Sequence, residues 1–233
     1  MENNPIRNID PDGTATFPII TITTEIIGRA QQRVLGYSNS LKNPEKFASA
    51  TVNVCKAVVT DTEDSNFRME FGVTRDAFAV TKGSYSDAYK DGKGEGSRNA
   101  SNVAFEPANG SDNIYEALEK SGGFPRGGPG ALYLTRDGDT QLPSSSRPAA
   151  VELGFGKKNS ADGVMLHAGG YYKYGSKTNL AASEACFGIV NVGNSPNNPS
   201  NATVNNVVSA VVSQANKSQT NPGLIQVVVE KRS

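Results

Sequence analysis

Turn-forming residues divide this chain into short apolar runs, and this division limits its possible folds more than any other feature. The 233 residues include 24 glycines and 12 prolines, with many asparagines and serines between the apolar runs. Short apolar runs separated in this way are typical of strands joined by turns and loops. The sequence therefore predicts a β-rich fold of mixed α+β type, a β-sandwich or barrel with one or two helices.

Apolar patterning places individual elements within that fold. Helical spacing predicts a helix over 204–216, and a second, short helix is expected at 114–120 with Ser111 or Asp112 as its N-cap. Asp137-Gly138 indicates a tight turn. Alternating or continuous apolar residues predict strands at 131–135, 163–167, 185–191 and 224–230. The segment 17–27 is expected to be a strand or a strand that runs into a helix, and 69–80 a strand or a hairpin bent near 74–76. A further short apolar run lies at 149–155.

Charge and ligand counts exclude several classes of function. Lys+Arg and Asp+Glu both number 23, so the chain lacks the basic excess typical of nucleic-acid binders, and no nucleic-acid partner is expected. No apolar stretch approaches the roughly 20 residues needed to span a bilayer. One histidine and two cysteines are fewer than the four ligands of a usual structural zinc site, and we expect no metal and no cofactor. A disulfide between Cys55 and Cys186 stays open at this point.

The only histidine and one of the cysteines form the strongest candidate for chemistry. An apolar strand carries His167 to its end, and Cys186 begins a second apolar strand 19 positions later. If the two strands are neighbours, the imidazole lies beside the thiol and promotes the thiolate, which is the nucleophile. Gly169 and Gly170 leave room for a substrate to approach the backbone. Cys55 lies in an apolar run and is expected to pack in the core.

The first residues carry a distinctive phrase. The string NNPIRNIDPDG at 3–13 resembles the phrase that closes the core shell of Rhs/YD-repeat proteins. In that family a variable toxin domain begins immediately afterwards. The resemblance implies that 1–13 is the end of an Rhs core, that 14–60 is an N-terminal extension or linker, and that 61–233 is a catalytic toxin domain. A leader without meaning is the alternative for 1–13, and residues up to 60 could also belong to the fold.

A second resemblance covers about 149–191. His167-Ala-Gly169, followed by Ser183-Glu-Ala-Cys186 and a short apolar strand, resembles the catalytic segment of L,D-transpeptidases of the YkuD type. The resemblance implies an L,D-transpeptidase-like β-sandwich or barrel, with Cys186 as the acyl-accepting nucleophile and His167 as its base. Two departures stand out. Glu184-Ala185 replaces the usual His-Gly before the cysteine, and the Arg or Asn that usually follows the cysteine has no clear counterpart.

Further residues near this segment are candidates for substrate contacts. Ser183 would orient the site or bind the donor peptide, with a plain turn hydroxyl as the alternative. Tyr171 and Tyr172 would wall the substrate groove, or form an ordinary strand end. Arg147 could meet a substrate carboxylate. Ala185 takes the position of a glycine that shapes the turn at the nucleophile.

Together the two resemblances imply a secreted antibacterial toxin that is delivered to the periplasm of a target bacterium. Its substrate would be a peptidoglycan stem peptide, attacked through a Cys186 thioester and resolved by hydrolysis, exchange or transpeptidation. A cognate immunity protein and the Rhs shell of the parent protein are the implied partners. One alternative keeps the Cys/His pair in a protease, deamidase or acyltransferase that acts on a cytoplasmic protein. Another is a β-rich module without enzymatic activity.

Overall fold

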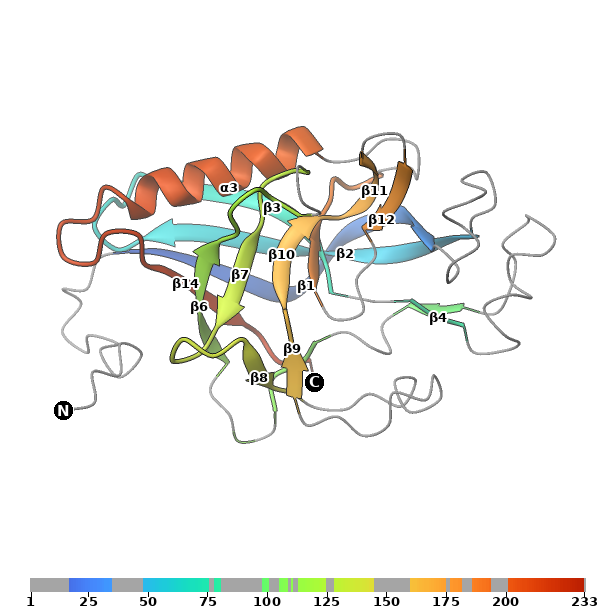
Figure 1. Ribbon diagram of the computed structural model, residues 1–233, viewed down its shortest axis with the longest axis horizontal. Coiled ribbons are helices and arrows are strands. Elements are labelled where there is room, and N and C mark those ends of the chain that lie inside the picture. Colours follow the sequence, from blue (N-terminus) through green and yellow to red (C-terminus); the bar gives the residue numbers. More distant parts are fainter. Residues whose placement is uncertain are drawn as a thin grey trace.

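A closed barrel of eight strands forms the centre of the molecule in the computed structural model of the chain (Figure 1). The structure describes residues 17–34, 48–75, 78–80, 98–100, 105–108, 110, 113–124, 128–144, 160–174, 177–181, 186–193 and 201–232. In order around the barrel, the strands are β1 (Pro18–Val34), β14 (Ile225–Val229), β6 (Ile114–Glu119), β7 (Leu132–Thr135), β10 (Met165–Ala168), β13 (Phe187–Ile189), β3 (Arg68–Thr74) and β2 (Ala48–Asp61).

Three small sheets and one helix complete the described part of the chain. Helix α3 (Asn201–Ala215) lies along one side of the barrel, above β7 and β10 in Figure 1, and contacts β1, β10 and β14. No helix in the described ranges is long and apolar enough to cross a membrane. The two-stranded sheets are β4 (Phe78–Val80) with β5 (Arg98–Ala100), β8 (Gln141–Pro143) with β9 (Ser160–Asp162), and β11 (Gly170–Tyr174) with β12 (Lys177–Ala181).

Two parallel pairs interrupt an otherwise antiparallel barrel. β1 pairs with β14, and β10 pairs with β13, both in parallel. The β1–β14 pair joins the first and last described strands, so the barrel closes through residues far apart in the sequence. The β10–β13 pair requires a crossover, because parallel strands cannot be joined by a tight turn, and the hairpin of β11 and β12 lies within that connection.

The core follows the alternation of the strands. In β14, Ile225, Val227 and Val229 are buried, and the intervening residues are half-buried. Tyr115 and Ala117 of β6 point to the same core. Helix α3 adds a buried apolar face to this cluster, made of Val204, Val207, Val208, Val211 and Ala215. Removal of this apolar surface from water is the main term that stabilises the barrel.

The β-rich fold with few helices is as expected from the sequence. The expected helix at 204–216 is α3, and the expected closing strand at 224–230 is β14. The turn at Asp137-Gly138 has φ of 53° and 78°, the pair of positive values that a type I′ hairpin turn requires. The short apolar run at 149–155 lies outside the described residues.

The prediction of a short helix at 114–120 is wrong. This segment is β6, which pairs with β14 on one side and β7 on the other. Its apolar residues fit a helical spacing as well as a strand, but pairing on both edges buries Tyr115 and Ala117 on one face. Tertiary pairing therefore overrides the local preference, as is common for short segments.

The expected boundary between an extension at 14–60 and a domain at 61–233 is also corrected. It falls inside β2, and both β1 and β2 are strands of the closed barrel. Ile20 and Ile22 of β1 and Ala57 of β2 are fully buried in the main core. Their burial is part of the barrel's own stability, so β1 and β2 belong to the domain. Residues 1–13 lie outside the described ranges.

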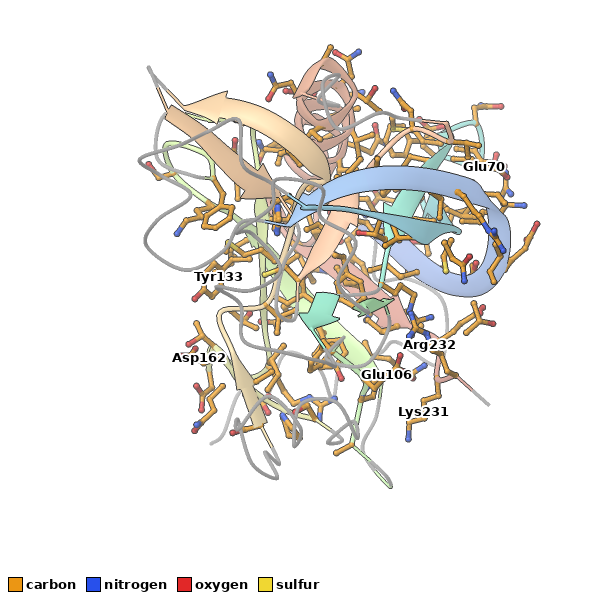
Figure 2. The ribbon with its side chains drawn as sticks, turned by 90° about the vertical axis from the view of Figure 1, so that its right-hand side faces the viewer. Glu70, Glu106, Tyr133, Asp162, Lys231 and Arg232 are labelled. Carbon is orange, nitrogen blue, oxygen red and sulfur yellow. The ribbon has the colours of Figure 1, made fainter. Side chains whose placement is uncertain are left out.

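A buried ion pair joins several strands at one end of the barrel. The Arg75 guanidinium donates to the carbonyl oxygens of Thr23, in β1, and Glu230, directly after β14, and lies 3.3 Å from the carboxylate of Glu106. Arg75 and Glu106 are 1% and 3% exposed. Arg232 is 3.2 Å from the other oxygen of Glu106, and Figure 2 shows the two side by side.

Loss of the Glu106 charge is expected to destabilise the protein. Glu106→Gln keeps the shape but removes the negative charge that faces the buried Arg75 guanidinium, which costs about 3 kcal/mol or more. The midpoint of urea unfolding should fall accordingly. Glu70→Gln, which removes a charge from the exposed Arg68–Glu70 pair, should leave the midpoint unchanged. Equal midpoints for Glu106→Gln and the wild type would contradict this account.

Candidate active site

The parallel pairing of β10 and β13 places His167 and Cys186 on the same face of the barrel wall. The register aligns Leu166 with Phe187 and His167 with Gly188. Leu166 and Phe187 belong to the barrel core. Because successive side chains alternate between faces, His167 and Cys186 both point away from that core, to the outer face. The expectation that the two strands are neighbours is confirmed.

The two side chains lie diagonally across the strand pair, without a hydrogen bond between them. Cys186 is two residues before Gly188, the partner of His167, so standard strand spacings put their Cβ atoms about 8 Å apart. The Cys186 thiol donates to the carbonyl oxygen of Gly163 at 3.5 Å. His167 Nε2 has no hydrogen-bond partner in the described part of the chain.

His167 is held as a neutral imidazole. The ring is 1% exposed, and burial lowers its pKa to about 4. Its Nδ1 lies 2.8 Å from the carbonyl oxygen of Ala168. Since a carbonyl can only accept, the proton is on Nδ1, and Nε2 carries the lone pair. The side chain therefore presents an unused basic nitrogen on the same face as the thiol.

Phe124, which follows β6, packs on the imidazole. The ring of Phe124 lies 4.9 Å from that of His167, centroid to centroid. Phe124 N–H donates to the carbonyl oxygen of Pro129 at 2.9 Å, which ties Phe124 to the residues before β7. These residues are in turn fixed to α3, because Gly130 N–H donates to Oδ1 of Asn205 at 2.8 Å. The helix thus holds the residues that desolvate His167.

Gly169 has a structural role that the sequence did not indicate. Its N–H donates to the carbonyl oxygen of Ile189 at 2.6 Å. A Cβ at this position would lie 2.9 Å from backbone atoms of Gly188 and Ile189. The absent side chain therefore lets β10 and β13 approach each other closely. Its predicted role, room for a substrate, stays a prediction.

The other predicted site residues are only partly placed. Gly170, Tyr171 and Tyr172 lie in β11, opposite Ala181, Leu180 and Asn179 of β12. Ser183, Ala185 and Arg147 lie outside the described residues. The structure therefore places His167 and Cys186 on one face of two neighbouring strands and packs Gly169 against Gly188 and Ile189. The contacts proposed for the remaining residues stay predictions.

Two residues that the sequence reasoning missed lie on the same face as the thiol. Tyr133 of β7 is the register partner of Met165, which is the next outward-facing residue before His167 in β10. Lys120 Nζ lies 5.2 Å from the centroid of the Tyr133 ring. The alternation at 131–135 predicted a strand, but no sequence signal showed that it would lie beside β10. Figure 2 shows Tyr133 on the side of the molecule opposite Glu106 and Arg232.

The two cysteines have different environments. Cys55 is 4% exposed and belongs to the main core, so the prediction that it packs there is confirmed. Cys55 and Cys186 do not form a disulfide. Within the described ranges, no group of three or more His, Cys, Asp or Glu side chains could hold a metal ion.

Burial of neutral His167 makes stability depend on pH. Its pKa is about 4 in the folded chain and about 6.5 when unfolded, so the unfolded state binds more protons between these values. We expect the free energy of unfolding to fall as the pH drops from 6.5 to 4, by about 3 kcal/mol in total. His167→Gln should lose this part of the dependence in urea unfolding at pH 7, 6 and 5. An unchanged profile in the variant would refute the assignment, since the chain has no other histidine.

A side chain at position 169 should force β10 and β13 apart. Gly169→Ala places a Cβ against fixed backbone, and we expect a loss of about 1–3 kcal/mol in the free energy of unfolding. Thermal unfolding measures it. Gly138→Ala in the exposed turn is the contrasting variant: its strain comes from a positive φ of 78° and not from a close contact, so amide exchange in β13 should rise only for Gly169→Ala.

Comparison with protein-family models, with curated proteins and with solved structures found no match to this chain. The case for a function therefore depends on the geometry around His167 and Cys186, together with the two resemblances in the sequence.

Proposed function

We propose that the chain is a cysteine-nucleophile enzyme that acts on peptidoglycan stem peptides, as an L,D-transpeptidase, an exchange enzyme or an L,D-carboxypeptidase. One observation carries the proposal: the β10–β13 pair puts a partly exposed thiol and a buried imidazole with an unused Nε2 lone pair on one face. A thiol nucleophile and a basic nitrogen are the two groups that acyl transfer by a cysteine enzyme requires.

In the proposed reaction, a rotation of the Cys186 side chain brings the thiol from Gly163 toward His167. Nε2 takes the thiol proton, and the sulfur attacks the carbonyl carbon of the L,D bond between a diamino acid and the terminal D-alanine. The bond to D-alanine breaks, its amine takes the proton from the imidazolium, and a thioester remains on Cys186. Water or another amine then attacks the thioester, gives its proton to Nε2 and releases the acyl group as the thiol re-forms.

The low pKa of His167 suits the second half of this cycle. An imidazolium with a pKa of about 4 is a stronger acid than an ordinary imidazolium, so it readily protonates the leaving amine. The same burial makes the first proton transfer harder. In the proposed reaction, bound substrate offsets that cost, because the sulfur attacks the carbonyl carbon at the same time as the thiol proton moves to Nε2.

The sequence supports the substrate and the setting of this proposal. His167-Ala-Gly169 and Ser183-Glu-Ala-Cys186 resemble the L,D-transpeptidase segment, and 3–13 resembles the end of an Rhs shell. We therefore propose a secreted toxin that acts in the periplasm of a target bacterium, with a cognate immunity protein. Ser183, Arg147, Tyr171, Tyr172, Gly170 and Ala185 keep their proposed roles at the substrate.

Muropeptide mass spectrometry tests the chemistry directly. Purified stem tetrapeptides incubated with the wild type should lose the terminal D-alanine, or exchange it for an added D-amino acid. Cys186→Ala and His167→Gln should lower the rate by at least about a thousandfold, because each removes one half of a pair that acts as a unit. Cys55→Ala is the matched control, since it removes the other thiol outside the site.

Toxicity after expression in the periplasm or in the cytoplasm is a second test of the same proposal. Expression in the periplasm should be toxic and expression in the cytoplasm harmless, with toxicity lost in Cys186→Ala. Toxicity in the cytoplasm with unchanged muropeptides would overturn the proposed substrate and favour a cytoplasmic protein. Full toxicity of folded Cys186→Ala would overturn the enzymatic proposal itself.

A further inference from the structure

Two contacts with helix α3 fix the backbone of Gly130, which lies two residues before β7. Its N–H donates to Oδ1 of Asn205 at 2.8 Å. A Cβ on Gly130 would lie 3.0 Å from the side chain of Val208, so the bare backbone lies directly against the helix. Asn205 and Val208 are three residues apart and are therefore neighbours on α3. The helix, which lies above β7 and β10 in Figure 1, thus holds Gly130 by one polar and one apolar contact.

Backbone contacts carry this attachment to Phe124. Phe124 N–H donates to the carbonyl oxygen of Pro129 at 2.9 Å. Gly123 has a positive φ of 70°, and a Cβ there would overlap with the same carbonyl oxygen. The Phe124 ring lies 4.9 Å from that of His167, centroid to centroid. Asn205 is therefore linked to the imidazole through a short series of contacts, although it is not itself a neighbour of the ring.

Packing, and not charge, sets the state of the imidazole. Burial lowers the pKa of His167 to about 4, and the hydrogen bond with the carbonyl of Ala168 opposes this change. Of the elements beside β10, α3 and β13 carry no ionisable side chain, and Cys186 directly precedes β13. Tyr133 of β7 and Lys120, after β6, contact each other. The position of Phe124 therefore matters directly for the basicity of the ring.

We propose that Asn205 is a positioning residue: by holding Gly130, it keeps Phe124 on the imidazole and so determines the strength of the candidate base. Nε2 of His167 has no partner in the described ranges, so the cover acts on an unused lone pair. Release of the cover hydrates the ring and makes it a better base near neutral pH, because a base works best when its pKa is close to the pH of the reaction. The inference rests on the proposed function only where it treats His167 as the base.

The NMR signal of the His167 ring tests the cover directly, since the chain has no other histidine. A titration from about pH 3 to 8 should give the folded wild type a pKa of about 4. Asn205→Ala should raise this pKa by about 0.7, because loss of one hydrogen bond increases the uncovered fraction about fivefold. Phe124→Ala, which removes the covering ring, should raise it further toward 6.5.

Two other variants of α3 separate positioning from loss of stability. Thr203→Val removes a hydrogen bond of 3.1 Å between the helix and Asn191, after β13, and leaves the contact with Gly130 intact. It should keep the wild-type pKa of the histidine. Asn205→Asp should keep it as well, because either form of a carboxyl group has an oxygen that accepts from the Gly130 N–H.

Three results of this titration would overturn the inference. The first is an unchanged pKa in Asn205→Ala. The second is an equal rise in Thr203→Val, which would assign the effect to a loosened helix. The third is an equal rise in Asn205→Asp, which would show that the hydrogen bond from Gly130 is not the cause.

Turnover separates this inference from the proposed function. The acid limb of the kcat/KM profile reports the pKa of the base in the free enzyme, so in Asn205→Ala it should move with the His167 signal. A shifted signal with an unshifted acid limb would overturn His167 as the base, and with it the proposed function. Absence of Cys186-dependent turnover in the wild type would also overturn the proposed function. An unshifted signal beside normal turnover would overturn the inference alone.

Discussion

A buried guanidinium connects barrel closure to the position of the candidate site. Arg75 follows β3 directly and binds carbonyl oxygens of β1 and of the residue after β14, with Glu106 as its counter-charge. An uncompensated charge at this depth costs several kcal/mol, so these segments hold a common arrangement. β3 also pairs with β13, and β13 begins directly after Cys186. The β10–β13 pair is therefore built onto a part of the barrel that electrostatics holds together.

Burial of the candidate base, His167, lowers the free energy of unfolding at low pH. Burial of His167 beneath Phe124 excludes the imidazolium form, and the fold loses free energy wherever the unfolded chain binds that proton. Strong shifts of this kind occur both at structural positions and at functional sites. At a structural position, a buried imidazole usually satisfies both nitrogens. Here Nε2 has no partner in the described ranges, and that feature is the one that favours a functional role.

The sequence predicted the positions of individual strands better than it predicted which strands lie side by side. Alternation identified β1, β7, β10, β13 and β14, and the order of the only histidine and Cys186 indicated two adjacent strands. The segment at 114–120 was misassigned because its spacing fits both periods, and pairing with β14 and β7 decided between them. The contributions of Phe124, Lys120 and Tyr133 could not be predicted, because each depends on which strands lie side by side.

Recognition of a charged donor by this chain must be short-range. The formal net charge is zero, so no overall field steers an anion to the thiol. At physiological salt, interactions between exposed charges are screened beyond about 8 Å, which leaves only cations fixed near the site.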